Sequence, residues 1–76
     1  MTSDIIRAAI RTRPFVPFTI VMADGGQHRI PHPDCLLLSH SGRTAYLINP
    51  DDTFTIIDLL LMTEVRLDEY VSPSGA

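Results

Sequence analysis

The side chains of this chain that could do chemistry gather in the stretch "HRIPHPDCLLLSH", which begins at His28. It holds all three histidines and the only cysteine of the chain. Zinc takes four ligands from Cys, His or a carboxylate, usually as two closely spaced pairs. His32 and Cys35 could form one such pair, with His28 as a third ligand and Asp34 or His40 as a fourth. The second close pair of a zinc signature is missing, so metal binding is one hypothesis and not the first one.

A Cys–His pair could also make a nucleophile. Cys35 opens a run of three leucines, so we expect a buried thiol, and a thiol in apolar surroundings is inert. We also expect a barrel of this size to lack room for a deep pocket of the roughly 300 Å³ or more that is usual for small-molecule sites. We therefore predict that the protein is not an enzyme and holds no cofactor. The stretch is interpreted as strand, turn and strand, with the turn at His32-Pro33-Asp34.

The elements around this stretch begin with a short helix, predicted over residues 3–12. Ile6, Ala9 and Ile10 follow the i, i+3, i+4 spacing of one apolar helix face. Pro14 ends the helix near residue 12, because the residue before a proline avoids the helical region. A helix of two to three turns is too short to stand alone, so it must pack on the rest of the domain.

From residue 18 onward the hydrophobic period is two, which is typical of strands. We predict strands at 18–23, 27–30, 35–39, 44–49, 53–58 and 64–70, with a one-turn connector at 59–63. Alternation along these strands places Phe18 and Phe54 in the core, with Ile56 on the face of Phe54. In the last strand it turns Val65 and Leu67 inward.

Short strands joined by tight turns form a meander, and we expect turns at Asp24-Gly25, 40–43 and 50–52. A meander with one short helix tends to close into a small barrel, because closure removes the exposed edges. We therefore predict a mainly β domain over residues 1–71, with five to six antiparallel strands and a flexible tail at 72–76.

The order of these elements resembles SH3-like barrels, and most closely the Sm-like version, in which a helix precedes five strands. The segment "TFTIIDLLLMTEVRL" is similar to the closing segment of Sm-like proteins. The residues through which Sm-like proteins contact RNA have no match in this chain. The resemblance therefore implies a fold and no function.

A second resemblance covers about residues 13 to 67. The segment "RPFVPFTIVMADGGQHRIPHPD" is similar to a pattern in small uncharacterised bacterial proteins, which combines Arg-Pro-Phe, Pro-Phe, Asp-Gly and His-Pro before an acid. The matching residues are Arg13, Pro14, Phe15, Pro17, Phe18, Asp24, Gly25, His32, Pro33 and Asp34. Gly26 departs from the pattern, where a polar or basic residue is expected. The resemblance implies a family of unknown function.

Charge bears on nucleic-acid binding, which we keep as the alternative function. Arg7, Arg11 and Arg13 near the predicted helix are its candidate residues. The net charge is −3 and the pI about 5.3, whereas a broad nucleic-acid footprint needs a net basic face. The chain also has five aromatic residues, two Tyr and three Phe, which is a thin platform for base stacking.

Self-association, or binding to a small protein partner, is the function that we favour. Chains below roughly 70–80 residues often need a disulfide, a metal or a partner subunit, and a single cysteine excludes an internal disulfide. The runs "CLLL" and "LIN" leave few polar positions to face water. Leu59, Leu60, Leu61 and Met62 are the candidate contact residues, because an exposed apolar patch usually marks an interface. With no secretory leader and no membrane span in sight, we expect a cytoplasmic protein.

Overall fold

The computed structural model describes residues 2–68. The helix is α1 (Thr2–Arg11), and the strands are β1 (Phe18–Met22), β2 (Gln27–Ile30), β3 (Leu36–Leu38), β4 (Thr44–Ile48), β5 (Phe54–Asp58) and β6 (Met62–Leu67). Two single 3-10 turns interrupt the strands, η1 (Pro33–Cys35) and η2 (Leu59–Leu61). The predicted mainly β class with a short N-terminal helix is confirmed. The tail at 72–76 lies outside the described residues, as do the last two residues of the predicted final strand.

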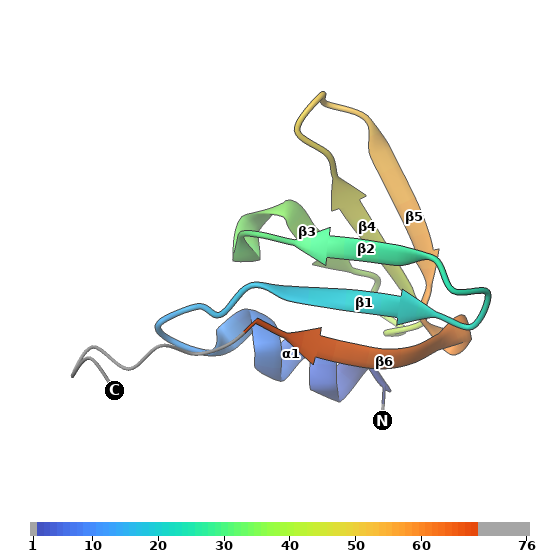
Figure 1. The fold of residues 1–76 in the computed structure, drawn as a ribbon, viewed down its shortest axis with the longest axis horizontal. Coiled ribbons are helices and arrows are strands. Elements are labelled where there is room, and N and C mark those ends of the chain that lie inside the picture. The colour runs from blue at the N-terminus through green and yellow to red at the C-terminus, as the bar shows by residue number, and fades with distance from the viewer. Residues whose placement is uncertain (1, 69–76) are drawn as a thin grey trace.

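The strands form two antiparallel sheets (Figure 1). Sheet A has the order β2-β1-β6, and sheet B has the order β3-β4-β5. The chain passes from sheet A to sheet B through η1 and returns through η2. In residues 2–68 no strand pairing joins the two sheets, so they are not closed into the barrel that we expected. Proline lacks the ladder donor, and "PHP" after β2 ends its pairing with a neighbour.

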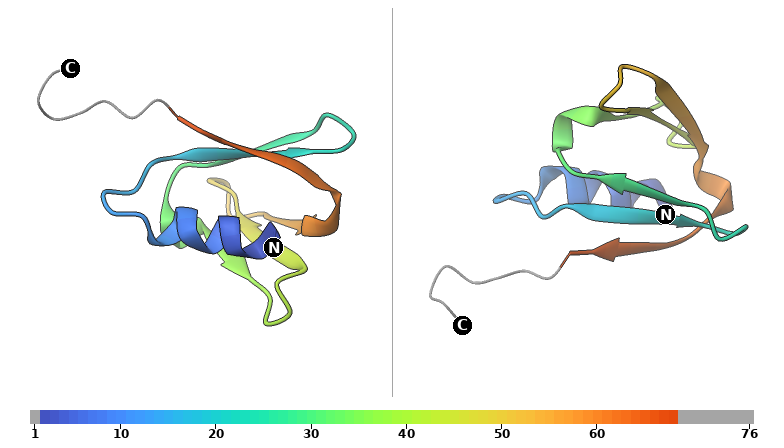
Figure 2. Two further views of the ribbon diagram at one scale, coloured as in Figure 1. Left: turned by 90° about the horizontal axis from the view of Figure 1, so that it is seen from below. Right: turned by 45° about the horizontal axis from the view of Figure 1, so that its top comes forward.

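The core lies between the two sheets and the helix. Its buried residues are Ile6, Ala9, Phe18, Ile20, Ile30, Leu36, Ala45, Leu47, Ile57 and Leu59. The helix packs against β6 and η2 (Figure 2) and buries Ile6 and Ala9, as its apolar spacing predicts. At ten residues, α1 is well short of a membrane span, and the described chain contains no helix that is long and apolar enough to cross one.

The expected hairpin turns are confirmed, and two of them use glycine in the left-handed region. Gly25 has φ of +90° and Gly42 has φ of +75°. A Cβ at Gly42 would lie 2.7 Å from Ser3 Oγ, whereas a Cβ at Gly25 would meet no atom within 4 Å. The β3–β4 turn is therefore pressed against the start of α1, whereas Gly25 in the β1–β2 turn faces open space.

Three side chains that were predicted to face the core are exposed. Phe54 is 72% exposed and Ile56 is 70% exposed, although alternation placed them in the core. Their orientation follows from the register of β5, in which Ile57 lies opposite Ala45 and faces the core. Leu67 is also exposed, because it is the last residue of β6, while Val65 packs against the core as predicted.

Candidate functional site

The outer face of sheet B is apolar. Its large exposed side chains are Leu37, Tyr46, Ile48, Phe54 and Ile56, which we call the sheet-B outer face. Strand register sets them in two adjacent rows: Leu37 lies opposite Tyr46 and Tyr46 opposite Ile56, while Ile48 lies opposite Phe54. Cross-strand neighbours on one face of a sheet are in contact distance. The five side chains therefore form one continuous surface.

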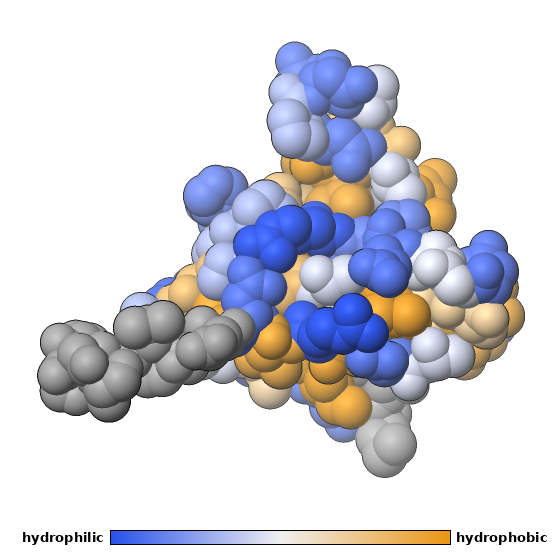
Figure 3. Space-filling model, in the orientation of Figure 1, coloured by the Kyte–Doolittle hydropathy of each residue, from blue (hydrophilic) through white to orange (hydrophobic). Residues whose placement is uncertain are grey.

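The outer face of sheet A is polar, which sets the two sheets apart. Its rows run from Arg29 through Thr19 to Arg66, and from Gln27 through Val21 to Glu64. Figure 3 looks onto this face, and its most hydrophilic residues lie over β2, β1 and β6. The same small domain thus carries one sheet face suited to water and one that is not.

An ion pair crosses the polar face. The Arg29 guanidinium donates two hydrogen bonds to the Asp68 carboxylate, of 3.0 and 2.6 Å. This hydrogen bonding and the opposite charge lower the pKa of Asp68 and raise the pKa of Arg29. Because β1 lies between β2 and β6, the pair ties together the two outer strands of sheet A.

Charged residues flank the sheet-B outer face at both ends. Asp51 and Asp52 lie in the β4–β5 turn, where the Asp51 carboxylate accepts a 2.6 Å hydrogen bond from the Thr53 hydroxyl. That bond and a second one from the Thr53 amide lower the pKa of Asp51. At the other end, Arg43 and Asp58 border a shallow cavity of about 370 Å³ beside Ile56.

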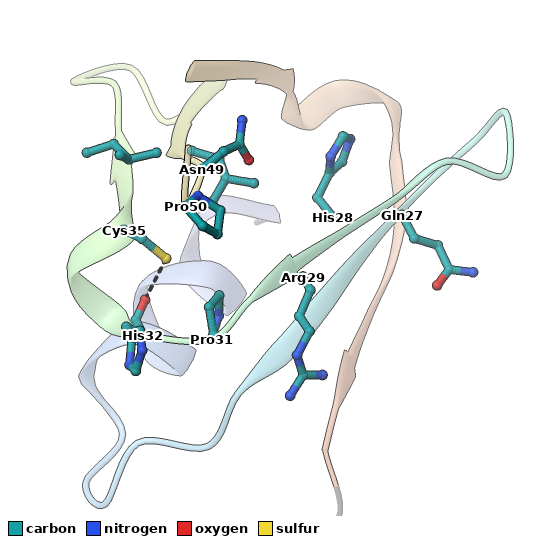
Figure 4. A pocket seen from close by; sticks show the side chains of 10 residues that line it. Gln27, His28, Arg29, Pro31, His32, Cys35, Asn49 and Pro50 are labelled. Carbon is teal, nitrogen blue, oxygen red and sulfur yellow. Dashed lines mark hydrogen bonds between the residues drawn. The ribbon is translucent and has the colours of Figure 1, made fainter. Parts of the chain in front are cut away.

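The histidine and cysteine stretch lines a different feature, an open cavity of about 620 Å³ between β2 and the end of β4. This cavity exceeds roughly 300 Å³ but is open to solvent, so our expectation that the domain lacks a deep pocket stays a prediction. His28, His32 and Cys35 all border it (Figure 4). His28 sits at one end of the cavity, whereas His32 and Cys35 lie at the other, beyond Pro31.

The predicted metal ligands are therefore near one cavity but not gathered. In the part of the chain that the structure describes, no group of three His, Cys, Asp or Glu side chains could hold a metal ion. Cys35 is half-buried, and its Sγ donates a 3.0 Å hydrogen bond to the carbonyl of His32. His40 is exposed in the turn between β3 and β4. The interpretation as strand, turn and strand is confirmed by β2, η1 and β3.

The three candidate arginines for nucleic acid lie on or just after α1. The Arg13 guanidinium donates to the carbonyls of Ile10 and Thr12, so it covers the end of the helix. Arg7 is half-buried and donates to Ser3 Oγ at 3.4 Å, while Arg11 is exposed. Two of the three guanidinium groups thus have partners within the helix segment.

The predicted contact residues after β5 divide into two kinds. Leu59 is buried and fills the core, and Met62 is half-buried against it. Leu60 and Leu61 are exposed, as expected of interface residues. Two residues of this segment therefore pack in or against the core, and the other two remain available for contact.

Sequence reasoning missed the sheet-B outer face as a unit. The runs "CLLL" and "LIN" did indicate strands that are apolar on both faces, and Leu37 and Ile48 confirm this. Phe54 and Ile56 were missed because "FTII" has apolar residues at both parities. The relevant signal was the pair of adjacent isoleucines, which permits either face to be buried.

Comparison of the chain with protein-family models, with curated proteins and with solved structures finds no significant match.

Proposed function

We propose that this protein is a small non-enzymatic assembly module that self-associates through the sheet-B outer face. The observation that carries the proposal is the exposure of five large apolar side chains in register on one sheet. Contiguous exposed apolar surface in a soluble domain usually marks an interaction site. Its position on rigid strands favours a fixed contact over an adaptable one.

The size of the surface supports a protein partner. From their exposed fractions, the five side chains present roughly 550 Å² to solvent, given about 200 Å² for each large apolar residue. A stable interface covers about 800 Å² on each partner, with an apolar centre and a polar rim. The charged residues at both ends of the face supply such a rim. A second copy satisfies these requirements, because its own face is equally apolar and equally in need of cover.

We also propose that the fold is a relative of SH3-like and Sm-like barrels that is open along one side. Its support is the division of the strands into two three-stranded sheets, with a one-turn break before the last strand. Membership of the uncharacterised bacterial family stays a prediction, while nucleic-acid binding and metal binding stay the alternative functions. A cytoplasmic location stays a prediction as well.

The test is sedimentation velocity of the full chain over about a hundredfold range of concentration. We expect a species of twice the 8.5 kDa chain mass that dissociates on dilution. The double variant Phe54→Thr/Ile56→Thr places threonine, a β-branched residue that suits strands, at both positions. This variant should remain monomeric at every concentration.

Leu60→Thr is the matched control, because Leu60 is 62% exposed but lies in η2 and is not one of the five residues of this face. It should associate like the unaltered chain. A chain that is monomeric at every concentration overturns the proposal. Association lost in Leu60→Thr and kept in the double variant would move the contact to η2.

A further inference from the structure

We infer that the two copies pack face to face about a two-fold axis that runs across the strands, with Asp51 of each copy against Arg43 of the other. The inference rests on the proposed function, since it names the orientation of that same contact. Two-fold packing brings the same surface patch of both copies together. The residues at the two ends of the face therefore decide which way the second copy lies.

The rows of the face have a definite order along the strands. From the Arg43 end toward the β4–β5 turn, they are Thr44 with Asp58, then Leu37 with Tyr46 and Ile56, then Ile48 with Phe54. Asp51 and Asp52 follow in the turn. The apolar rows thus lie between an end with one charge of each sign and an end with two carboxylates. The β4–β5 turn reaches past the rest of the domain (Figure 1), and both Asp51 and Asp52 are exposed.

An axis along the strands would place like ends together. Asp51 and Asp52 of both copies would then meet as four carboxylates, and like charges across an interface oppose association. Protonation of Asp51 would not readily relieve this repulsion, because hydrogen bonds from the hydroxyl and the amide of Thr53 favour the charged carboxylate. An axis across the strands instead sets this turn over the opposite end of the second copy.

Arg43 is the group at that opposite end that can receive a carboxylate. Its backbone is fixed, because its amide hydrogen-bonds to Ser41 Oγ at 3.3 Å and its carbonyl accepts from the Leu59 amide at 2.8 Å. Its side chain is exposed and makes no ion pair within residues 2–68. The neighbouring Asp58 carboxylate is already engaged by the Leu60 amide, at 3.0 Å. Arg43 is therefore free to pair with Asp51 of a second copy.

A charge exchange within one chain tests the orientation. The variants are Arg43→Glu, Asp51→Arg and the double variant Arg43→Glu/Asp51→Arg, each studied by sedimentation equilibrium. With the axis across the strands, each single variant sets two side chains of like charge, at positions 43 and 51, against each other at both ends of the contact. Its dimer Kd should therefore rise about tenfold or more. The double variant restores opposite charges at both ends, so its Kd should return to within a few-fold of the unaltered value.

Two further variants serve as controls for this experiment. Asp51→Asn removes the charge but keeps a side-chain acceptor for Thr53, so it should weaken association less than Asp51→Arg without disturbing the turn. Arg66→Glu makes the same charge change as Arg43→Glu on the polar face of sheet A, and its Kd should stay within a few-fold of the unaltered value.

The outcomes separate the two claims. A double variant that associates no better than either single variant overturns the inferred orientation, as does a set of single variants that associate normally. The proposed function survives both results, because a dimer is still observed. If the unaltered chain does not self-associate at all, the proposed function fails and the inferred orientation fails with it.

Discussion

Ile56 and Ile57 are neighbours in β5 and face opposite sides of sheet B, one 70% exposed and the other 1% exposed. Successive side chains of a strand alternate between faces, and the pairing of Ile57 with Ala45 decides which isoleucine is inside. The pair thus divides two roles between chemically identical residues. Ile57 stabilises the domain, and Ile56 belongs to the face that we assign to association.

This division predicts different effects of the same substitution. Ile57→Ala leaves a cavity in the core and should lower the free energy of unfolding by about 2–5 kcal/mol. Ile56→Ala should change it by less than about 0.5 kcal/mol, because the side chain is exposed in the single chain. Urea denaturation at concentrations where the chain is monomeric measures both. Equal losses for the two variants would contradict the register of β5.

Gly42 should tolerate a side chain less well than Gly25. Alanine at either position adopts the left-handed region, which costs about 1 kcal/mol. At Gly42 the new Cβ would also collide with Ser3 at the start of α1, at 2.7 Å from its Oγ. We expect Gly42→Ala to lower the melting temperature clearly more than Gly25→Ala. A similar decrease for both would mean that the β3–β4 turn does not press on the helix.

The pH dependence of the polar face should follow the Arg29–Asp68 pair. The pKa of Asp68 is lowered from its ordinary value by hydrogen bonds and charge from Arg29. A carboxylate with a lowered folded-state pKa stabilises the fold above its unfolded pKa, and this contribution is lost as pH falls through the folded pKa. Arg29→Gln should therefore raise the pKa of Asp68, measured by carboxyl carbon NMR, and flatten the acid side of the stability profile.

Asp51 serves as the internal control in the same spectra, because its lowered pKa comes from Thr53. Its titration should be unchanged in Arg29→Gln. In Thr53→Val the hydroxyl donor is gone, so the pKa of Asp51 should rise while that of Asp68 stays low. A joint shift of both carboxyls in either variant would argue against separate local causes.

Asp58 should stabilise the turn before β6. Its carboxylate accepts the Leu60 amide at 3.0 Å and so caps η2. Asp58→Ala should lower the free energy of unfolding by about 1 kcal/mol. Asp58→Asn keeps an acceptor for the Leu60 amide, so it should lower the free energy of unfolding by only about 0.3 kcal/mol. Thermal denaturation of the two variants measures this difference in stability. An alanine variant as stable as the asparagine variant would show that the cap contributes nothing.

Zinc should not stabilise the protein. His28 lies apart from His32 and Cys35 around the open cavity, and the described residues contain no group of three metal-binding side chains. A ligand that binds the folded state raises its stability, so the melting temperature should be the same with added zinc and with a chelator. An increase with zinc that Cys35→Ser abolishes would revive the metal hypothesis.

Local signals in the sequence predicted most of the elements. The helix, the hairpin turns and the break at "PHPD" each depend on residues with strong backbone preferences, such as Pro14 and Gly25. What local signals could not decide was the strand face of "FTII", because either isoleucine satisfies the alternation. Closure into a barrel was also beyond them, since it depends on pairing between edge strands of the two sheets, and the two sheets share no pairing in residues 2–68.

The candidate site shows the same limit. Leu60 and Leu61 were identified as exposed leucines and are exposed. The sheet-B outer face could not be assembled from the sequence, because its members come from three strands and meet only through their register. The histidines drew attention because of their chemistry, yet their spacing along the chain did not bring them together.

The absence of strand pairing between the two sheets in residues 2–68 has a consequence for how the domain comes apart. Because no ladder of hydrogen bonds joins the two sheets in residues 2–68, we expect their contact to rest on the packing of core side chains, with η1 and η2 as the chain connections between them. Moving the two sheets apart would separate core side chains without breaking the hydrogen bonds between paired strands. A second molecule bound to the outer face of sheet B would therefore stabilise the pairing within that sheet and leave the side-chain packing between the two sheets unchanged.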